Sequence, residues 1–179
     1  MNDIKNKLKL FINNNLVDEV KKTKLVNNIS IFKDEESVNI DNKSSFYKIK
    51  KTNKNSNIED YFNKHNQYSD FQTMLFKLID DRNLKDSDVY NKVHIDRRLF
   101  SKIRSDNNYH PSKETIILLA IALELTEYEL DELLNSASYS LPKNNKYDLI
   151  IRFCFINKIF KISDINELLH EYNYKLFNY

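Results

Sequence analysis

The chain of 179 residues contains no glycine. A phosphate-binding loop, a dinucleotide fingerprint, a nucleophile elbow and a kinase glycine-rich loop all need glycine, either for a tight turn or for close approach of the backbone to a ligand. These enzyme classes are therefore excluded. Each turn that requires a positive φ must instead use Asn, Asp or another polar residue, at some steric cost.

Cysteine and long apolar runs are scarce as well. Cys154 is the single cysteine, so the chain forms no intramolecular disulfide and suits a reducing cytosol. No apolar run approaches the ~18 residues that a membrane-spanning helix needs. Residues 1–15 lack the apolar core and the cleavage site of a secretory signal. We expect a cytoplasmic protein with no membrane partner.

Residues suited to catalysis or metal binding are few and scattered. The chain has four histidines, which are His65, His94, His110 and His170. None of them has a histidine partner at i+4 or a Cys/His cluster beside it, so no metal site is indicated. Cys154 lies inside an apolar run, which is typical of a core residue rather than of a reactive thiol. We therefore expect a protein that is not an enzyme, with no catalytic residue, no cofactor and no metal.

Charge is distributed unevenly along the chain, although the total is only +2. Residues 1–66 contain 13 Lys and nine acidic residues, residues 70–138 contain nine basic and 13 acidic residues, and residues 139–179 contain six and four. The middle part therefore carries a net charge of −4. An acidic domain loses much of the phosphate attraction that supports binding to DNA.

Residues 1–66 form an N-terminal segment of unknown fold. The spacing of Ile4, Leu8, Phe11 and Ile12 predicts a helix over about 3–22. Short apolar pieces follow, and they fit either short strands or apolar points on a disordered arm. This Lys/Asn-rich part contains a run over 50–57 that is a linker by composition.

Residues 69–138 predict a bundle of five helices. The first helix is expected over about 70–82, with Ser69 or Asp70 as its cap, and the second over 87–93, with a cap at Asp86 or Ser87. The later helices are expected to start at three residues with good cap chemistry: Asp96, Ser112 and Thr126. Thr126 precedes Glu129 by three positions, which is the capping-box pattern.

The helix that starts after Asp96 combines an apolar side with a basic side. When it is projected at ~100° per residue, Leu99, Phe100 and Ile103 fall on one side. The opposite side or its edge carries the candidate DNA-binding residues: Arg97, Arg98, Ser101, Lys102 and Arg104. Arg can pair with guanine edges or phosphates. The alternative is an exposed amphipathic helix whose basic groups are favoured by the dipole at its C-terminus.

The motifs IDRRLFSKIRS, at 95–105, and YHPSKET, at 109–115, resemble the lambda-repressor-like (XRE-like) helix-turn-helix domain. The variant they resemble is found as a C-terminal module in Firmicute proteins, including some that carry a macro domain. The resemblance covers about residues 69–177 and implies a repressor-like bundle that binds DNA. This chain departs from the general repressor pattern because Asp106-Asn107-Asn108 replaces the glycine that usually follows the recognition helix.

Residues 139–179 predict a C-terminal extension of two helices, one over about 143–158 and one that starts at Ser163. Their dense apolar and aromatic side chains need a partner surface. That surface is either the chain's own bundle, which we favour, or a second copy. If the protein binds DNA specifically, we expect a homodimer, because one recognition helix covers only a half-site.

The expected fold class is all-α, with a five-helix repressor-like bundle, a C-terminal helical extension and a less regular N-terminal segment. Two functions remain open. The first is a bacterial or phage DNA-binding protein in transcription regulation. The alternative is a protein-interaction adaptor built on the same fold without DNA binding. The two differ in where the acidic residues should lie, because acids that surround the basic helix would repel DNA.

Overall fold

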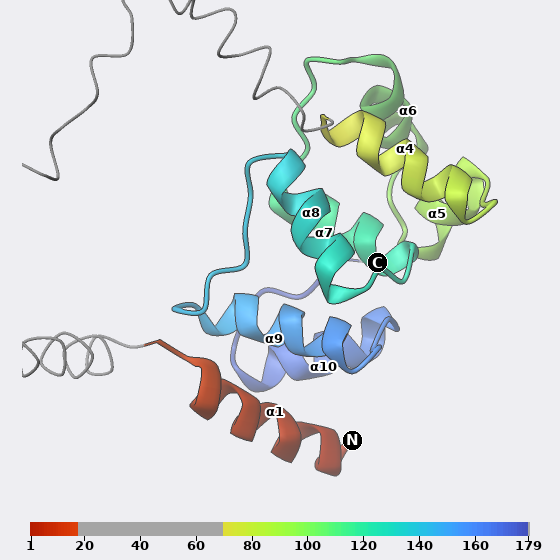
Figure 1. The fold of residues 1–179 in the computed structure, drawn as a ribbon. Helices are drawn as coiled ribbons and strands as arrows, with labels where there is room; N and C mark the ends of the chain where they lie inside the picture. Colours follow the sequence, from red (N-terminus) through yellow and green to blue (C-terminus); the bar gives the residue numbers. More distant parts are fainter. Residues whose placement is uncertain (18–69, 179) are drawn as a thin grey trace, which may run out of the picture. The chain divides into compact units, whose positions relative to one another are not determined.

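A computed structural model describes residues 1–17 and 70–178 (Figure 1). This part of the chain contains eight α-helices and no strand, so the all-α expectation is confirmed for it. The helices are α1 (Asn2–Asn15), α4 (Phe71–Asp81), α5 (Asp86–Lys92), α6 (Arg97–Ser105), α7 (Lys113–Ala122), α8 (Glu127–Ser136), α9 (Lys146–Ile156) and α10 (Ile162–Glu171). Not one of these helices is long and apolar enough to cross a membrane. The predictions for short strands, for a disordered arm and for the linker at 50–57 lie outside the described residues.

Four of the predicted caps begin their helices as expected. Each accepts hydrogen bonds from backbone N–H groups of the first turn, and they are Asp70, Asp96, Ser112 and Thr126. The predicted cap of α5 at Asp86 or Ser87 is wrong, because the helix begins one residue earlier with Lys85 as its N-cap. The Lys85 side chain cannot accept a hydrogen bond. Instead, the Asp88 carboxylate accepts the backbone N–H of Lys85 at 3.2 Å.

Six of the described helices end in the same way, although the chain has no glycine. The residue after each C-cap has a positive φ of 51–59°, and these residues are Asn83, His94, Glu124, Ser138, Lys158 and Asn173. The following residue then donates back to the last turn, as the Leu125 N–H does to the Ala120 carbonyl at 3.1 Å. This is the Schellman motif, in which glycine is usual at the positive-φ position. Asn serves twice, and the other four positions carry the steric cost of a side chain there.

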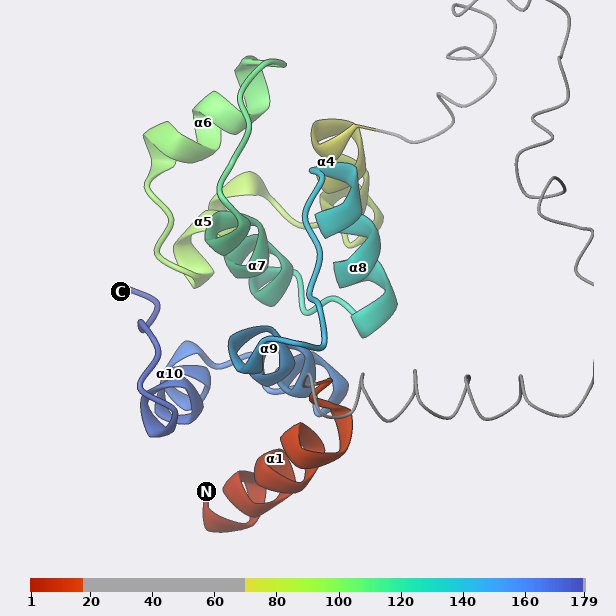
Figure 2. The same cartoon turned by 90° about the vertical axis from the view of Figure 1, so that its left-hand side faces the viewer.

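The core of the bundle is built around α7. Six of its ten residues are buried, which makes it apolar on nearly every side. α5 and α8 pack against α7, and α4 packs against α8 (Figures 1 and 2). Amphipathic helices therefore pack around one central apolar helix, which leaves their polar sides on the surface.

α9 and α10 form a second layer on the bundle, below α7 and α8 in Figures 1 and 2. The Arg152 guanidinium of α9 bonds the carboxylates of Glu127 at 2.6 Å and Asp131 at 2.9 Å, both on α8. Cys154 faces the core, and burial raises the pKa of its thiol to about 12. The thiol is therefore protonated at neutral pH and chemically inert.

The N-terminal helix α1 belongs to this second layer, whereas the sequence placed all of residues 1–66 in one separate segment. Leu8 and Ile12 are buried, and the rings of Phe11 and Phe153 lie 5.5 Å apart. The Lys5 ammonium also pairs with the Glu167 carboxylate of α10 at 2.8 Å. The described residues 1–16 and 70–178 accordingly belong to one compact unit.

Candidate nucleic-acid interface

α6 is held on the bundle by its apolar side. Phe100 and Ile103 are buried, and the Phe100 ring contacts the rings of Phe76 on α4 and Tyr90 on α5, at 6.2 and 5.5 Å between centroids. Leu99, which was predicted to share this buried side, is only half-buried. The contact side of α6 is therefore narrower than the projection indicated, and more of the helix surface faces solvent.

The outward side of α6 brings together all of the predicted site residues. Every one of them is exposed, and together with Ser105 they are Arg97, Arg98, Ser101, Lys102 and Arg104. A hollow of about 660 Å³ lies along one flank of the helix and is lined by α6 residues and Asp106. A second hollow of about 350 Å³ lies on the other flank, between α6 and the start of α5. Hydrogen-bond donors therefore line both flanks of an exposed helix.

The cations on α6 differ in how they are bound within the protein. Arg104 pairs with the Asp86 carboxylate of α5, and its guanidinium carbon lies 3.9 Å from the centre of the Phe76 ring on α4. A cation over an aromatic ring is attracted by the negative face of that ring. Arg104 therefore connects three helices, a role that a single-helix projection could not indicate.

Lys102 is held more weakly than Arg104, by a single contact with an aromatic ring. The Lys102 ammonium lies 4.5 Å from the centre of the Tyr109 ring, in the loop after α6. Within the described residues, Arg97 and Arg98 make no side-chain hydrogen bond or ion pair. Their guanidinium groups are thus free to bind an external acceptor.

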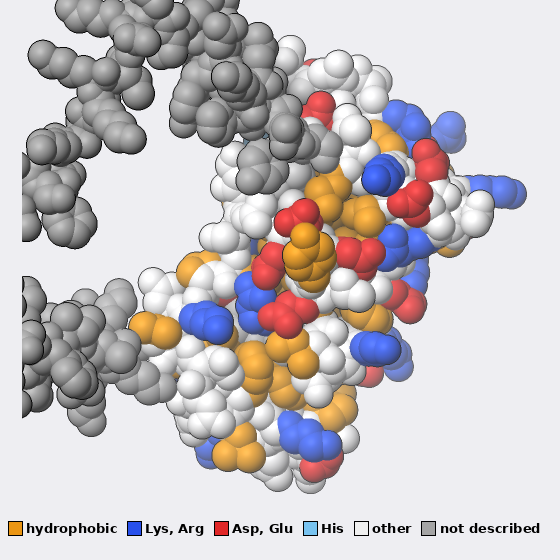
Figure 3. Space-filling model, viewed as in Figure 1, with side chains coloured by type: hydrophobic (Ala, Val, Ile, Leu, Met, Phe, Trp, Pro, Cys, Tyr) orange, Lys and Arg blue, Asp and Glu red, His pale blue; other side chains and the backbone are white. Residues whose placement is uncertain are grey.

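The acidic residues next to α6 are already bound to other groups. The Asp96 carboxylate caps the helix by accepting the Arg98 N–H at 2.6 Å, Asp86 pairs with Arg104, and Asp106 accepts the Asn108 N–H at 3.0 Å. The larger acidic group lies on α8, which has four acidic residues and no basic one. Figure 3 shows acidic side chains gathered over that helix. In this part of the chain the acids do not surround α6.

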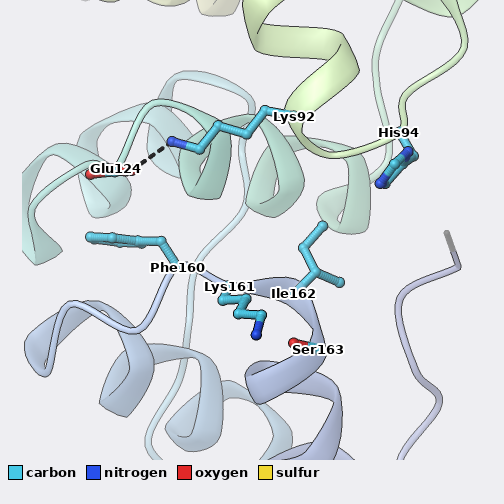
Figure 4. Close-up of a pocket in the computed structure, with 7 residues that line it drawn as sticks. All are labelled: Lys92, His94, Glu124, Phe160, Lys161, Ile162 and Ser163. Atoms are coloured by element: carbon cyan, nitrogen blue, oxygen red, sulfur yellow. Dashed lines mark hydrogen bonds and ion pairs between the residues drawn. The ribbon is translucent and has the colours of Figure 1, made fainter.

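A further hollow of about 500 Å³ lies between the end of α5 and the start of α10 (Figure 4). Lys92 and Glu124 pair along one side of it at 2.6 Å, so their charges largely cancel. Phe160 and Ile162 supply apolar wall, and Lys161 lies beside them. The lining residues come from three separate segments, so no local pattern could have predicted this hollow. Within residues 1–17 and 70–178, no group of three metal-binding side chains lies together here or elsewhere.

Comparisons with known proteins assign no family to this chain. No protein-family model, no curated protein and no solved structure matches it. The geometry and charge of α6 and its neighbours are therefore the basis for assigning a function.

Proposed function

We propose that the protein is a DNA-binding regulator that places α6 in the major groove. The observation that carries this proposal is the pair of exposed arginines, Arg97 and Arg98, which have no partner among the described side chains. Arg can donate two hydrogen bonds to O6 and N7 of guanine. The nearby Ser101 hydroxyl is exposed and supplies a smaller donor and acceptor.

The arrangement of α5 and α6 supports this proposal. Only four residues, 93–96, separate the two helices, a turn length that is common in helix-turn-helix motifs. In this proposal α4 to α8 are a lambda-repressor-like (XRE-like) domain, and α6 is its recognition helix. The acidic character of the bundle is tolerated because its largest acidic group lies on α8 rather than beside α6, and Arg82 and Arg152 pair with three of those four acids.

The residues of α6 take different roles in this proposal. Arg97, Arg98 and Ser101 contact base edges, and Lys102 contacts phosphate. Arg104 stays bound to α4 and α5 and holds α6 in place, instead of contacting DNA as the sequence predicted. A two-fold dimer would place two copies of α6 in half-sites ~34 Å apart.

A protein-interaction adaptor is the second candidate, and one observation favours it. Tyr128 on α8 is 72% exposed, and tyrosine is enriched at protein interfaces. In this alternative, α8 binds a basic partner, and α6 is simply an exposed basic helix.

DNA binding is tested with a duplex that the protein itself selects from a random pool, titrated at several salt concentrations. We expect Arg98→Ala to cost about 1–3 kcal/mol of binding free energy and to relax preference at one base position. Lys102→Ala should weaken binding to all DNA sequences alike, and it should reduce the slope of log affinity against log salt concentration by about one unit. Lys146→Ala, which removes an exposed charge from α9, is the matched control and should change neither. If Arg98→Ala and Lys102→Ala leave DNA affinity unchanged while Tyr128→Ala abolishes capture of a partner, the adaptor is the function.

A further inference from the structure

α6 ends differently from the six helices that close with a Schellman motif. Its C-cap, Asp106, has φ −114° and ψ 98°, so the chain leaves the helix in an extended direction. The Asp106 N–H still donates to the Lys102 carbonyl at 3.0 Å. The later carbonyls of the last turn, beginning with that of Ile103, then lack a partner within the helix.

A side chain from α4 supplies the missing donors. The Gln72 amide nitrogen donates to the Ile103 carbonyl at 2.6 Å and to the Asp106 carbonyl at 2.8 Å. A glutamine amide has two N–H groups, and both are used here. Gln72 precedes these acceptors by 31 and 34 positions. The Asp106 carbonyl also accepts the Tyr109 N–H at 2.9 Å, whereas the donor to the Ile103 carbonyl comes from a separate helix, so tertiary structure supplies this part of the cap of α6.

We propose that Gln72 is a positioning residue for the DNA-contacting side of α6. It holds the last turn of the helix, which carries Lys102 and Ser105, and the start of the loop that contains Tyr109. Arg104 holds the same helix sideways against α4 and α5. This inference rests on the proposed function, because positioning matters only if α6 binds a ligand.

Loss of this cap should affect specific and non-specific binding differently. Without Gln72 the Ile103 carbonyl loses its donor, and the last turn of α6 opens more often. Base contacts depend on the exact placement of side chains, whereas non-specific affinity depends mainly on their charge. Gln72 is neutral, so its removal leaves the charge of the protein unchanged.

The test uses the full-length chain with Gln72→Met, which removes both donors but keeps the length of the side chain. Thr73→Met, at the neighbouring exposed position of α4, is the matched control. Hydrogen exchange of the backbone amides of residues 104–106 should become roughly three- to tenfold faster in Gln72→Met. This is the factor expected from the loss of one or two hydrogen bonds. The ratio of affinities for a selected and a scrambled duplex should fall by a similar factor, with an unchanged salt slope. Thr73→Met should change none of these quantities.

Unchanged exchange together with an unchanged affinity ratio would overturn the inference. An equal loss of affinity for both duplexes would also overturn it, because that result describes general destabilisation. If the wild-type protein binds no DNA, the proposed function fails, whereas the exchange measurement still decides whether Gln72 caps α6. Should Gln72→Met not fold, Gln72→Asn takes its place, since its amide is one methylene too short to reach both carbonyls and should give the same losses.

Discussion

Glycine at a helix end should stabilise this protein, and Lys158 is the best position at which to test it. Lys158 has a φ of 54° and follows the C-cap of α9, where the Ile159 N–H donates to the Cys154 carbonyl at 2.8 Å. The Lys158 side chain is exposed and makes no hydrogen bond or ion pair with any other described residue. Lys158→Gly therefore changes the backbone preference and removes one solvated charge.

The size of the effect follows from two opposing terms. A side chain in the left-handed region costs roughly 1–2 kcal/mol, and glycine removes that cost. Glycine also loses more backbone entropy on folding, by roughly 0.5–1 kcal/mol. We expect Lys158→Gly to raise the free energy of unfolding by about 0.5–1 kcal/mol, which corresponds to a shift of about 1–4 °C in Tm for a chain of this size.

Urea unfolding measures this change, and three variants control it. Lys158→Ala removes the same charge but keeps a β-carbon, so it should leave the free energy of unfolding nearly unchanged. Asn83→Gly should gain less than Lys158→Gly, because Asn tolerates a φ of 52° better than Lys does. Lys77→Gly, in the middle of α4, should lose about 1 kcal/mol. If Lys158→Gly is no more stable than Lys158→Ala, or if Asn83→Gly gains as much stability as Lys158→Gly, the positive φ of Lys158 does not carry the expected cost.

Two further predictions concern the core and the acid response. Ile103→Ala should cost about 2–5 kcal/mol of stability by opening a cavity. Leu99→Ala should cost clearly less, because Leu99 is only half-buried. Thermal unfolding of both variants checks this order, and equal losses of stability would contradict it. Burial opposes ionisation of Glu129, but hydrogen bonds from Arg82 and Thr126 outweigh burial and lower its pKa below 4.5. The stabilisation by ionised Glu129 is therefore present above about pH 4.5 and lost as pH falls through its lower folded pKa, so Glu129→Gln should make stability less sensitive to pH between about 5 and 3. An unchanged pH dependence in urea unfolding would count against that assignment.

Local signals in the sequence were enough to locate most of the described helices. The capping of Asp96, Ser112 and Thr126 involves a side chain and an N–H group two or three residues later, so the prediction needs no knowledge of the fold. The starts of α5 and α10 were each misplaced by one residue, because Lys85 and Lys161 precede them and carry no cap signal. The helix predicted over about 143–158 spans only Lys146–Ile156, because its cap at Asn145 was missed. The helix predicted over about 3–22 ends at Asn15. Helical position is thus a local property wherever the capping chemistry is local.

The absence of glycine also predicted which type of residue would occupy the positive-φ positions at the helix ends. A positive φ had to fall on Asn, Asp or another polar residue, and all six positive-φ residues that the structure describes are polar. Which residues these would be was less predictable, since Glu124 and Lys158 have no preference for that conformation. The apolar residue that follows each of them is buried or half-buried, and its packing holds the strained residue in place.

Tertiary structure alone decided the partners of long side chains and of whole helices. Helical projection correctly placed Arg104 on the exposed side of α6, but it could not show that Asp86 and Phe76 would bind it. The same limit applies to Gln72, whose acceptors lie more than 30 positions away, and to α1, whose apolar side was visible although its partner α9 was not. Periodicity defines the direction of a side chain from its own helix axis, whereas the groups that meet it depend on how the helices pack.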